Sequence, residues 1–298
     1  MTDSVVICIP TCKRPKMLKR LLDSIAAQET KAVISVLVAD NDCEGRAGMD
    51  LCLAMDDYPW PLTAVMAPHR GIAQARNVLI EYALMTGANF IAMIDDDEWP
   101  EKDWIEQFLD CAHATGADLL QGSILFDRDM RGHGDIRHPS GPIDMPQGAG
   151  NLLMRRALLE EMTAPWFDPQ FALSGGEDQD FFFRLRRAGK RFAWCDQARA
   201  HSEVPESRAN LGWLLRRSYS CGNSDMRVLL KHDPGFGHVL AELMKILALL
   251  LLSPLAAVIL APSPNRRAIP LQKLFRAAGK LSAMAGRRYN EYAVIHGE

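Results

Sequence analysis

Four consecutive acids follow a short apolar run in the stretch 90-FIAMIDDDEWP-100. Like charges repel one another, and removing a carboxylate from water is costly unless something compensates its charge. The run is therefore either a solvated loop or a site where carboxylates hold a divalent cation at the end of a buried strand. Because alternate side chains of an extended segment point the same way, Asp95 and Asp97 would share a face. Oxygen ligands of this kind suit hard cations.

A second group of acids could do acid–base chemistry. Glu177 and Asp178 follow two glycines, where the pattern predicts the start of a helix. The free N–H groups and positive dipole end of a helix N-terminus suit acids, so the pair could simply cap the helix. A carboxylate there could also take a proton from a hydroxyl group as a general base. Asp180, two residues on, is the alternative base.

The hydrophobic pattern predicts an α/β fold that would bring such polar groups together. Continuous apolar runs and one-sided helical patterns predict strands at 5–9, 33–39, 63–67 and 89–94 and helices at 15–28, 72–86 and 101–115. Such a sequence of elements is typical of a Rossmann-like, mostly parallel sheet covered on both faces. Polar clusters at 10–14, 40–42 and 95–98 follow three of the strands. They should converge at the carboxyl edge of the sheet, where such folds bind ligands.

Beyond residue 115 the pattern is weaker. Residues 127–147 are rich in Gly, Pro and charge and predict a long loop, followed by a structured segment at 148–162. Asp127-Arg128-Asp129 repeats the spacing of Asp95 and Asp97 but ends no clear apolar strand, so we interpret it as solvated. A helix that ends at Gly189 and a further strand come next.

Composition excludes several classes of protein. The 298 residues carry a net charge of −3, which gives no nucleic-acid signature. Seven cysteines without a CxxC pair suggest neither a disulfide framework nor a zinc site, and a reducing compartment fits. The N-terminus lacks a basic region followed by a long apolar core, so we expect no signal peptide and a cytoplasmic start.

The chain resembles the family 2 glycosyltransferases, the inverting GT-A fold enzymes that move a sugar from a nucleoside diphosphate to an acceptor. It looks most like bacterial members of the succinoglycan-biosynthesis type, which build exopolysaccharide. The resemblance covers roughly residues 4–225. The stretches that carry it, in the family's order, are 5-VVICIPTCKRPKMLKRLLDSIAAQ-28, 36-VLVADND-42, 70-RGIAQARN-77, 91-IAMIDDDEWP-100, 148-GAGNLLMRR-156 and 175-GGEDQDFFFRL-185.

The resemblance implies a metal-dependent reaction. Asp97 would bind Mg²⁺ or Mn²⁺ directly, and Asp95 would lie nearer the ribose of the donor and the metal. Many GT-A enzymes have a third ligand, often His, after the helix that carries the base, which suggests His201, although the residues around it depart from the family. Asp96 would point away, as a structural or solvated acid, and Glu98 would be peripheral.

The resemblance also assigns the donor, the acceptor and the base. The donor would be a nucleotide sugar, with a UDP-sugar expected, and the acceptor a lipid-linked or polymeric surface glycan. Asp40 would bind the base of the nucleotide, and Arg76 and Asn77 would lie near the diphosphate or the metal, unless Arg76 is an exposed helix residue and Asn77 a helix cap. Asp178 would be the general base and Glu177 would orient the acceptor. The nucleotide pocket would be shaped by Pro10, Thr11 and Arg14.

The helix at 211–225 resembles the family's closing segment, in which Arg216, Arg217 and Tyr219 would contact phosphate or acceptor or form a solvated basic face. Two rival functions remain. A sugar nucleotidyltransferase would need a glycine-rich phosphate loop, and 10-PTCKRP-15 has no glycine. A non-catalytic membrane scaffold would have little reason to keep both acid motifs.

The C-terminal part differs from the rest in composition. We therefore divide the chain into a catalytic domain at 1–232 and a membrane-associating segment at 233–298. The run 246-ILALLLLSPLAAVILA-261 has 16 residues and includes Pro254, whereas about 20 apolar residues are needed to span a bilayer. From Ala261 to Asn290 there are seven basic residues and no acid, which leaves 34 − 7 = 27 basic against 37 acidic residues elsewhere.

The tail itself predicts an amphipathic helix. Its apolar face comprises Leu271, Leu274, Phe275, Ala278, Leu281 and Ala285, opposite Lys273, Arg276, Lys280 and Arg287. This pattern is typical of a helix that lies in an anionic membrane surface, and the alternative is a soluble helix that packs on the catalytic domain. A single span would place the basic tail outside, against the positive-inside rule. We therefore expect a monotopic or re-entrant attachment to the cytoplasmic face of the cell membrane.

Overall fold

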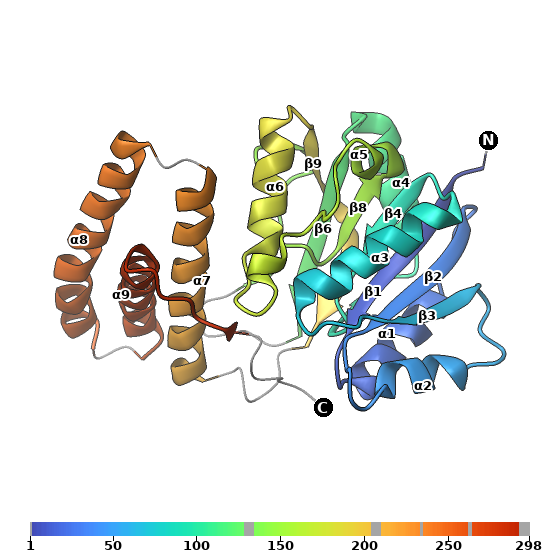
Figure 1. Cartoon of the computed structure of the whole chain (residues 1–298), viewed down its shortest axis with the longest axis horizontal. Coiled ribbons are helices and arrows are strands. Elements are labelled where there is room, and N and C mark those ends of the chain that lie inside the picture. The colour runs from blue at the N-terminus through green and yellow to red at the C-terminus, as the bar shows by residue number, and fades with distance from the viewer. Residues whose placement is uncertain (1, 128–133, 204–209, 233–234, 262–263, 292–298) are drawn as a thin grey trace.

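A mixed sheet with helices on both faces forms one end of the molecule, and a layer of three C-terminal helices forms the other (Figure 1). The computed structural model describes residues 2–127, 134–203, 210–232, 235–261 and 264–291. The expected α/β fold with a largely parallel sheet is confirmed. Residues 128–129 of the second acidic repeat lie outside the described residues.

The strands follow the order β3-β2-β1-β4-β8-β6-β9-β5, and β7 pairs with β9. β1, β2, β3 and β4 are mutually parallel, as are β6 and β9, whereas β8, β5 and β7 run antiparallel to their neighbours. The bounds are β1 Ser4–Thr11, β2 Val33–Asp40, β3 Leu62–Met66, β4 Phe90–Met93, β5 Glu98–Pro100, β6 Leu119–Phe126, β7 Gly141–Ile143, β8 Leu152–Arg155 and β9 Phe192–Ser202.

Helices cover both faces, which is why the central strands are apolar throughout. α1, α2 and α4 pack in the core on one face, and α3, α5 and α6 pack in the core on the other. α1 begins at Pro15 and buries its leucines on a single stripe, as the sequence pattern predicts. The bounds are α1 Pro15–Ala26, α2 Ala47–Leu53, α3 Ile72–Thr86, α4 Trp104–Thr115, α5 Arg156–Glu160 and α6 Glu177–Arg187, with a 3₁₀ turn at Pro169–Phe171.

Two short strands depart from the sequence prediction. β7 lies inside the segment predicted as a long loop, and β5 begins at Glu98, within the acid cluster itself. Each has three residues and contains a proline, a residue confined to edges and strand ends because it cannot donate to the ladder. Strands this short carry no periodic signal that a sequence pattern could detect.

The C-terminal layer consists of α7 (Leu211–His232), α8 (Phe236–Ile259) and α9 (Pro264–Met284). α7 and α9 approach so closely that glycine is required on both. A Cβ atom on Gly222 would lie 2.0 Å from the carbonyl oxygen of Arg276, and one on Gly279 would lie 2.0 Å from that of Tyr219. α7, the last helix of the predicted catalytic domain, is therefore built into the layer that the rest of the C-terminal segment forms.

The tail helix presents only part of the two faces that its sequence predicts. α9 buries the small residues Ala268, Ala277 and Ala283, while Phe275 remains partly exposed. Arg276 forms an ion pair with Asp225 of α7, and Lys280 pairs with Glu242 of α8. Two of the basic residues expected to face a membrane thus bridge α9 to its neighbours, and Leu271, Leu274 and Leu281 of the predicted apolar face are half-buried.

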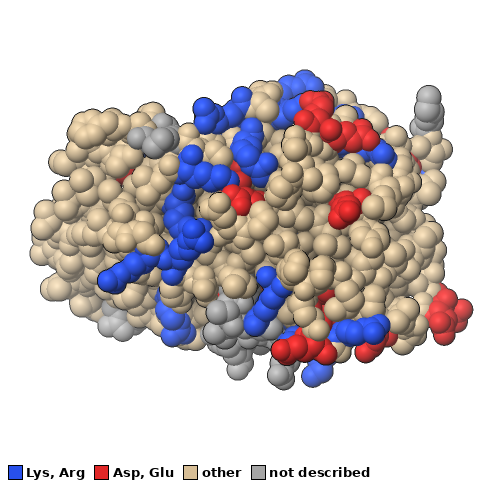
Figure 2. Space-filling model, viewed as in Figure 1, with Lys and Arg blue, Asp and Glu red and all other residues tan. Residues whose placement is uncertain are grey.

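α8 is the one described helix that is long and apolar enough to cross a membrane, judged by length and composition. It has 24 residues, includes Pro254, and is only 11% buried over its most apolar window. At 1.5 Å per residue it is about 36 Å long, more than the 16-residue apolar run suggests. In the view of Figure 2, few charged side chains lie over α8, and a line of Lys and Arg side chains runs between it and the sheet.

Candidate active site

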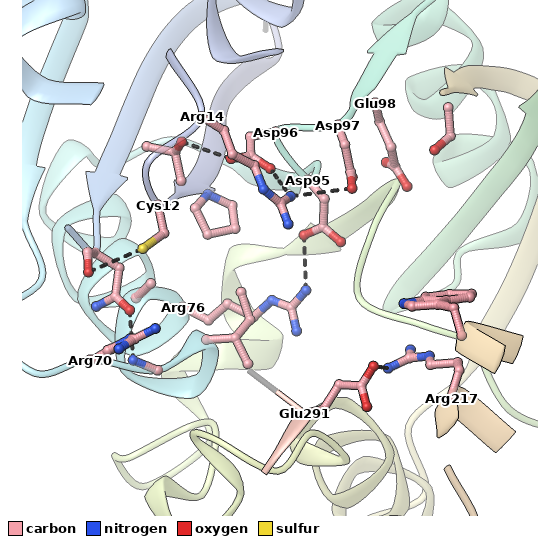
Figure 3. Close-up of a pocket in the computed structure, with 18 of the residues that line it drawn as sticks. Cys12, Arg14, Arg70, Arg76, Asp95, Asp96, Asp97, Glu98, Arg217 and Glu291 are labelled. Atoms are coloured by element: carbon pink, nitrogen blue, oxygen red, sulfur yellow. Dashed lines mark hydrogen bonds and ion pairs between the residues drawn. The ribbon is translucent and has the colours of Figure 1, made fainter. Parts of the chain in front are cut away.

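A cavity of about 380 Å³ opens at the carboxyl edge of β1, β2 and β4 (Figure 3). Its size lies in the range of small-ligand sites. Each of the three predicted polar clusters contributes side chains to its wall: residues 10–12 and 14, Asn41, and residues 95–98. The convergence predicted from strand order is therefore present in the structure.

Asp96 anchors the acid cluster to the end of β1. It is 5% exposed, and its carboxylate accepts hydrogen bonds from Thr11 Oγ1 at 2.8 Å and Arg14 Nη1 at 2.9 Å. Burial raises the pKa of Asp96 to about 6, although the Arg14 guanidinium opposes the shift. Arg14 Nη1 also lies 3.4 Å from Asp97 Oδ2. Thr11 and Arg14 thus contact the acids. Asp96 lines the cavity with its neighbours, which corrects the expectation that it points away, and its bonds give it a structural role.

Glu98 is not peripheral, which corrects the sequence prediction. It begins β5, is 6% exposed and lines the cavity. Its Oε2 atom is buried and makes no hydrogen bond to any residue that the structure describes. Burial first, and then the charges of Asp95 and Asp97, raise the pKa of Glu98 well above its ordinary value.

Arg76 joins the two acid motifs. It lies in the first turns of α3 and is 4% exposed, so it is not the exposed helix residue of the alternative interpretation. Its guanidinium donates to Asp95 Oδ1 at 3.0 Å and to Glu177 Oε1 at 2.5 Å. Glu177, in turn, is 2% exposed, and burial followed by the charge of Asp178 raises its pKa to about 7 despite Arg76.

The two candidate bases are in different environments. Asp178 is partly exposed beside Glu177 at the start of α6, and its Oδ1 accepts from the backbone N–H of Gln179. Asp180 is fully buried and accepts hydrogen bonds from Arg184, Lys231 and His232. Burial alone would raise the pKa of Asp180, but these cationic partners lower it. Its lone pairs are used to join α6 to α7, which leaves Asp178 as the more accessible carboxylate.

Two predicted donor residues do not line the cavity. Asp40 is fully buried, and its oxygens accept from the backbone N–H groups of Asp42 and Met49 at 2.9 Å each. Its contact with the nucleotide base stays a prediction. Asn77 uses both ends of its amide to hold the backbone of Phe167, at 2.7 and 2.8 Å. The structure therefore gives Asn77 a role in loop positioning, and its place near the diphosphate or the metal stays a prediction.

His201 is not brought to the acid cluster either, which corrects its assignment as a metal ligand. It stacks on Trp99 with 5.7 Å between ring centroids and lies 3.5 Å from Glu101. The register of β5 with β9 pairs Glu98 with Ser202 and Trp99 with His201. Because neighbouring side chains on a strand point to opposite faces, Ser202 reaches the cavity and His201 faces away.

The far wall of the cavity contains Arg217, which the family resemblance predicted, and two residues that the sequence did not indicate, Trp213 and Glu291. Trp213 and Arg217, four residues apart on one face of α7, line it together with Glu291 from the tail. Arg217 Nη1 lies 3.7 Å from Glu291 Oε1. Neither Arg216 nor Tyr219 lines the cavity, and Tyr219 instead packs against Tyr289. Arg70 also lines the cavity and was not predicted, although it lies in a stretch that carried the family resemblance.

The donor set at the acid cluster suits a hard divalent cation. Within the described part of the chain, no three His, Cys, Asp or Glu residues are arranged to hold a metal by themselves. A Mg²⁺ site needs only one or two carboxylates when substrate phosphates complete it, and Asp95 and Asp97 offer two. The buried Glu98 oxygen makes no hydrogen bond among the described residues, and Asp95 and Asp97 each lie beside a guanidinium group. Both features indicate an excess of negative charge, which a cation would balance.

Known proteins resemble this chain in sequence. The model of the family "Glycosyl transferase family 2" matches residues 6–163. The succinoglycan biosynthesis protein ExoM of Rhizobium meliloti is 33% identical over 246 residues, which cover 78% of each chain. The glucosyl-dolichyl phosphate glucuronosyltransferase of Haloferax volcanii is 25% identical over 256 residues, which cover 75% of this chain and 76% of the relative.

Solved structures share the fold. S. aureus TarS 1-349 in complex with UDP aligns with a TM-score of 0.56 at 15% identity, covering 97% of this chain and 93% of TarS. GalNAc-T7 with UDP, GalNAc and Mn²⁺ aligns with a TM-score of 0.59 at 13% identity, covering 77% of this chain and 48% of GalNAc-T7.

Proposed function

The chain belongs to glycosyl transferase family 2 and is a glycosyltransferase of the exopolysaccharide-synthesis type, and we propose that it moves a sugar from a nucleotide sugar to a lipid-linked or polysaccharide acceptor. The observation that carries the proposal is the Arg76 bridge. One buried guanidinium binds both Asp95, beside the cavity, and Glu177, beside the candidate base. The bridge ties the proposed donor-binding and proton-accepting groups to one rigid frame.

The proposed donor is a UDP-sugar. The TarS structures contain UDP and UDP-GlcNAc, and they share this fold. The cavity offers arginines from three elements for a diphosphate: Arg14 before α1, Arg76 of α3 and Arg217 of α7. Guanidinium groups suit phosphate because they present paired donors in a fixed plane.

We propose that Asp95 and Asp97 hold Mg²⁺ or Mn²⁺ together with the donor phosphates, and that no histidine takes part. The bound ion would neutralise the charge that develops on the leaving nucleoside diphosphate. Asp96 contributes indirectly, since its bonds to Thr11 and Arg14 fix the backbone between the two ligands.

Asp178 is the proposed general base. In the reaction the acceptor hydroxyl oxygen attacks the anomeric carbon on the face opposite the diphosphate, and the bond from that carbon to the diphosphate oxygen breaks. The anomeric centre inverts because the attack comes from the opposite face, and Asp178 takes the hydroxyl proton as the new bond forms. Glu177, held by Arg76, is the proposed orienting group for the acceptor.

The proposed location is the cytoplasmic face of the cell membrane, where nucleotide sugars are available. α8 exposes a row of large apolar side chains, among them Leu251 at 76% and Leu255 at 59%. Ion pairs join α9 to both α7 and α8, so an α8 that crossed the bilayer would carry these charged pairs towards the hydrocarbon core, where they are costly. These contacts favour a helix that lies in the membrane surface over a single span.

Nucleotide release from a panel of nucleotide sugars, measured with and without EDTA, tests the function. We expect release from one donor class, loss of release with EDTA, and recovery when Mg²⁺ or Mn²⁺ is restored. Release of pyrophosphate from a sugar phosphate and a nucleoside triphosphate would instead indicate a nucleotidyltransferase. If no donor is turned over or bound, the non-catalytic scaffold is the better interpretation.

Membrane flotation tests the location. Replacing Leu251 and Leu255 with glutamate should release the protein from vesicles that contain anionic lipid, while its donor turnover in detergent is kept. Leu53→Glu is the matched control, because Leu53 is 66% exposed on α2, away from the helical layer. Equal binding of the α8 variant and the control variant would contradict the assignment of α8 as the attachment site.

A further inference from the structure

The C-terminal tail returns from the helical layer to the donor cavity. After α9 ends at Met284, the chain runs back along α7 and places Glu291 in the cavity wall, opposite the arginine of α7 (Figure 3). The Glu291 side chain is 15% exposed and the Arg217 side chain is 45% exposed. An acid from the last described residue of the chain thus lies inside the proposed anion-binding site.

Glu291 is held there by contacts close to it in sequence. Asn223 of α7, which is fully buried, donates to the carbonyl oxygen of Arg287 at 2.9 Å and accepts from the backbone N–H of Tyr289 at 3.4 Å. The Tyr289 ring packs edge-on against Tyr219 of α7, with 5.5 Å between ring centroids. The tail is therefore fixed on α7 two residues before Glu291.

The charge of Glu291 opposes the proposed ligand. A carboxylate in a cavity that binds a diphosphate repels it, and the same carboxylate neutralises the guanidinium nearest to it. The 3.7 Å separation of Arg217 Nη1 and Glu291 Oε1 exceeds hydrogen-bond distance, and Arg217 is nearly half exposed. Such a pair is weak enough for a polyanion to displace.

We propose that Glu291 competes with the donor for Arg217. The tail carboxylate neutralises this arginine when no donor is bound, and the diphosphate of the donor replaces the carboxylate when it binds. The inference rests on the proposed function, because it takes the cavity to be the donor site. It assigns the segment outside the predicted catalytic domain a direct effect on nucleotide affinity.

Calorimetric titration with UDP and Mg²⁺ tests the proposal on the full chain in detergent. Glu291→Gln should tighten UDP binding about twofold to fivefold at low salt, the range of a partly exposed ion pair, and the gain should shrink at high salt. Arg217→Gln should weaken binding, and adding Glu291→Gln to it should restore little. Arg216→Gln is the control, because Arg216 is exposed and does not line the cavity, so Glu291→Gln should keep its gain in that background.

Three results would overturn the proposal: weaker UDP binding by Glu291→Gln, unchanged binding, or an equal gain in the Arg217→Gln background. Weaker binding would make Glu291 a group that orients Arg217. Glu291→Ala, checked for folding by circular dichroism, serves if the glutamine variant fails to fold. If the wild-type protein binds none of UDP, GDP and CDP, the proposed donor site itself is wrong, which differs from binding that Glu291→Gln does not improve.

Discussion

Removing Arg76 should destabilise the protein by an amount that depends on pH. Its partner Glu177 is 2% exposed, so Arg76→Met leaves a buried carboxylate without its cation. Breaking a buried ion pair in this way costs about 3–5 kcal/mol when the remaining group must stay charged. Protonation of Glu177 removes its charge and so avoids this cost, and its pKa is already raised from 4.5 to about 7.

The sign follows from proton linkage. The folded protein keeps the Glu177 proton between about pH 4.5 and 7, where the unfolded chain releases it, so this group's contribution to stability falls as pH rises through that range. Arg76→Met raises the pKa of Glu177 further and extends the fall above pH 7. At pH 6 the substitution should cost about 2 kcal/mol, because it removes the hydrogen bonds to Glu177 and Asp95. At pH 8.5 it should cost about 4 kcal/mol, since each added pH unit above 7 contributes about 1.4 kcal/mol.

Urea unfolding in nonionic detergent at pH 6 and pH 8.5 measures these costs, and in the double variant with Glu177→Gln the pH-dependent part should vanish. Arg137→Met is the matched control. Its partner Asp196 has a pKa lowered to about 2 by a hydrogen bond from Arg137, so it is ionised at both pH values. Equal costs for Arg76→Met at the two pH values, or a larger cost at pH 6, would refute the assignment of a buried, proton-linked pair.

The acid cluster, the base and the helical layer each give a further prediction. Asp97→Ala should abolish transfer and Mn²⁺ binding at unchanged unfolding free energy, whereas Asp96→Ala should lower that free energy by about 1–3 kcal/mol; equal effects in both assays would contradict the division of roles. Asp178→Asn should keep UDP binding and lower turnover by roughly 10²–10⁴, and near-normal turnover would exclude it as the base. Gly279→Ala should cost about 1–3 kcal/mol in urea unfolding, because its Cβ would meet a backbone carbonyl of α7, while Gly237→Ala, which meets nothing within 4 Å, should cost little.

The first half of the fold could be predicted from the sequence because its signals are local. β1 to β4, α1 and α3 match the predicted segments closely, since buried parallel strands are continuous apolar runs and each covering helix has one apolar stripe. The convergence of the polar clusters followed from topology alone. In a parallel sheet the strand ends share an edge, so residues such as Arg14 and Asp95 had to meet.

The rest of the site depends on packing that leaves no local pattern. His201 faces away because of the register between a three-residue strand and β9, and no periodicity predicts that register. The sequence left Arg76 as either a site residue or an exposed helix residue, and its burial follows from the acids on both sides of it. Glu291 reaches the cavity because α9 lies close against α7, where two glycines are needed, and because the tail then folds back onto α7. Such close approaches are invisible until the helices are in place.

The four acids that line the cavity differ in how their charges are compensated, and this difference is the strongest argument that they have different roles. Asp96 is buried and hydrogen-bonded to Thr11 and Arg14, so displacing its side chain would break both hydrogen bonds. Glu98 is buried with an oxygen unbonded among the described residues, so it relies on a proton or a nearby cation. Asp95 and Asp97 are held by guanidinium groups that a diphosphate could also bind. A donor that arrives with its metal ion could therefore exchange partners with both ion pairs at once, leaving the arginines on the phosphates and the carboxylates on the ion.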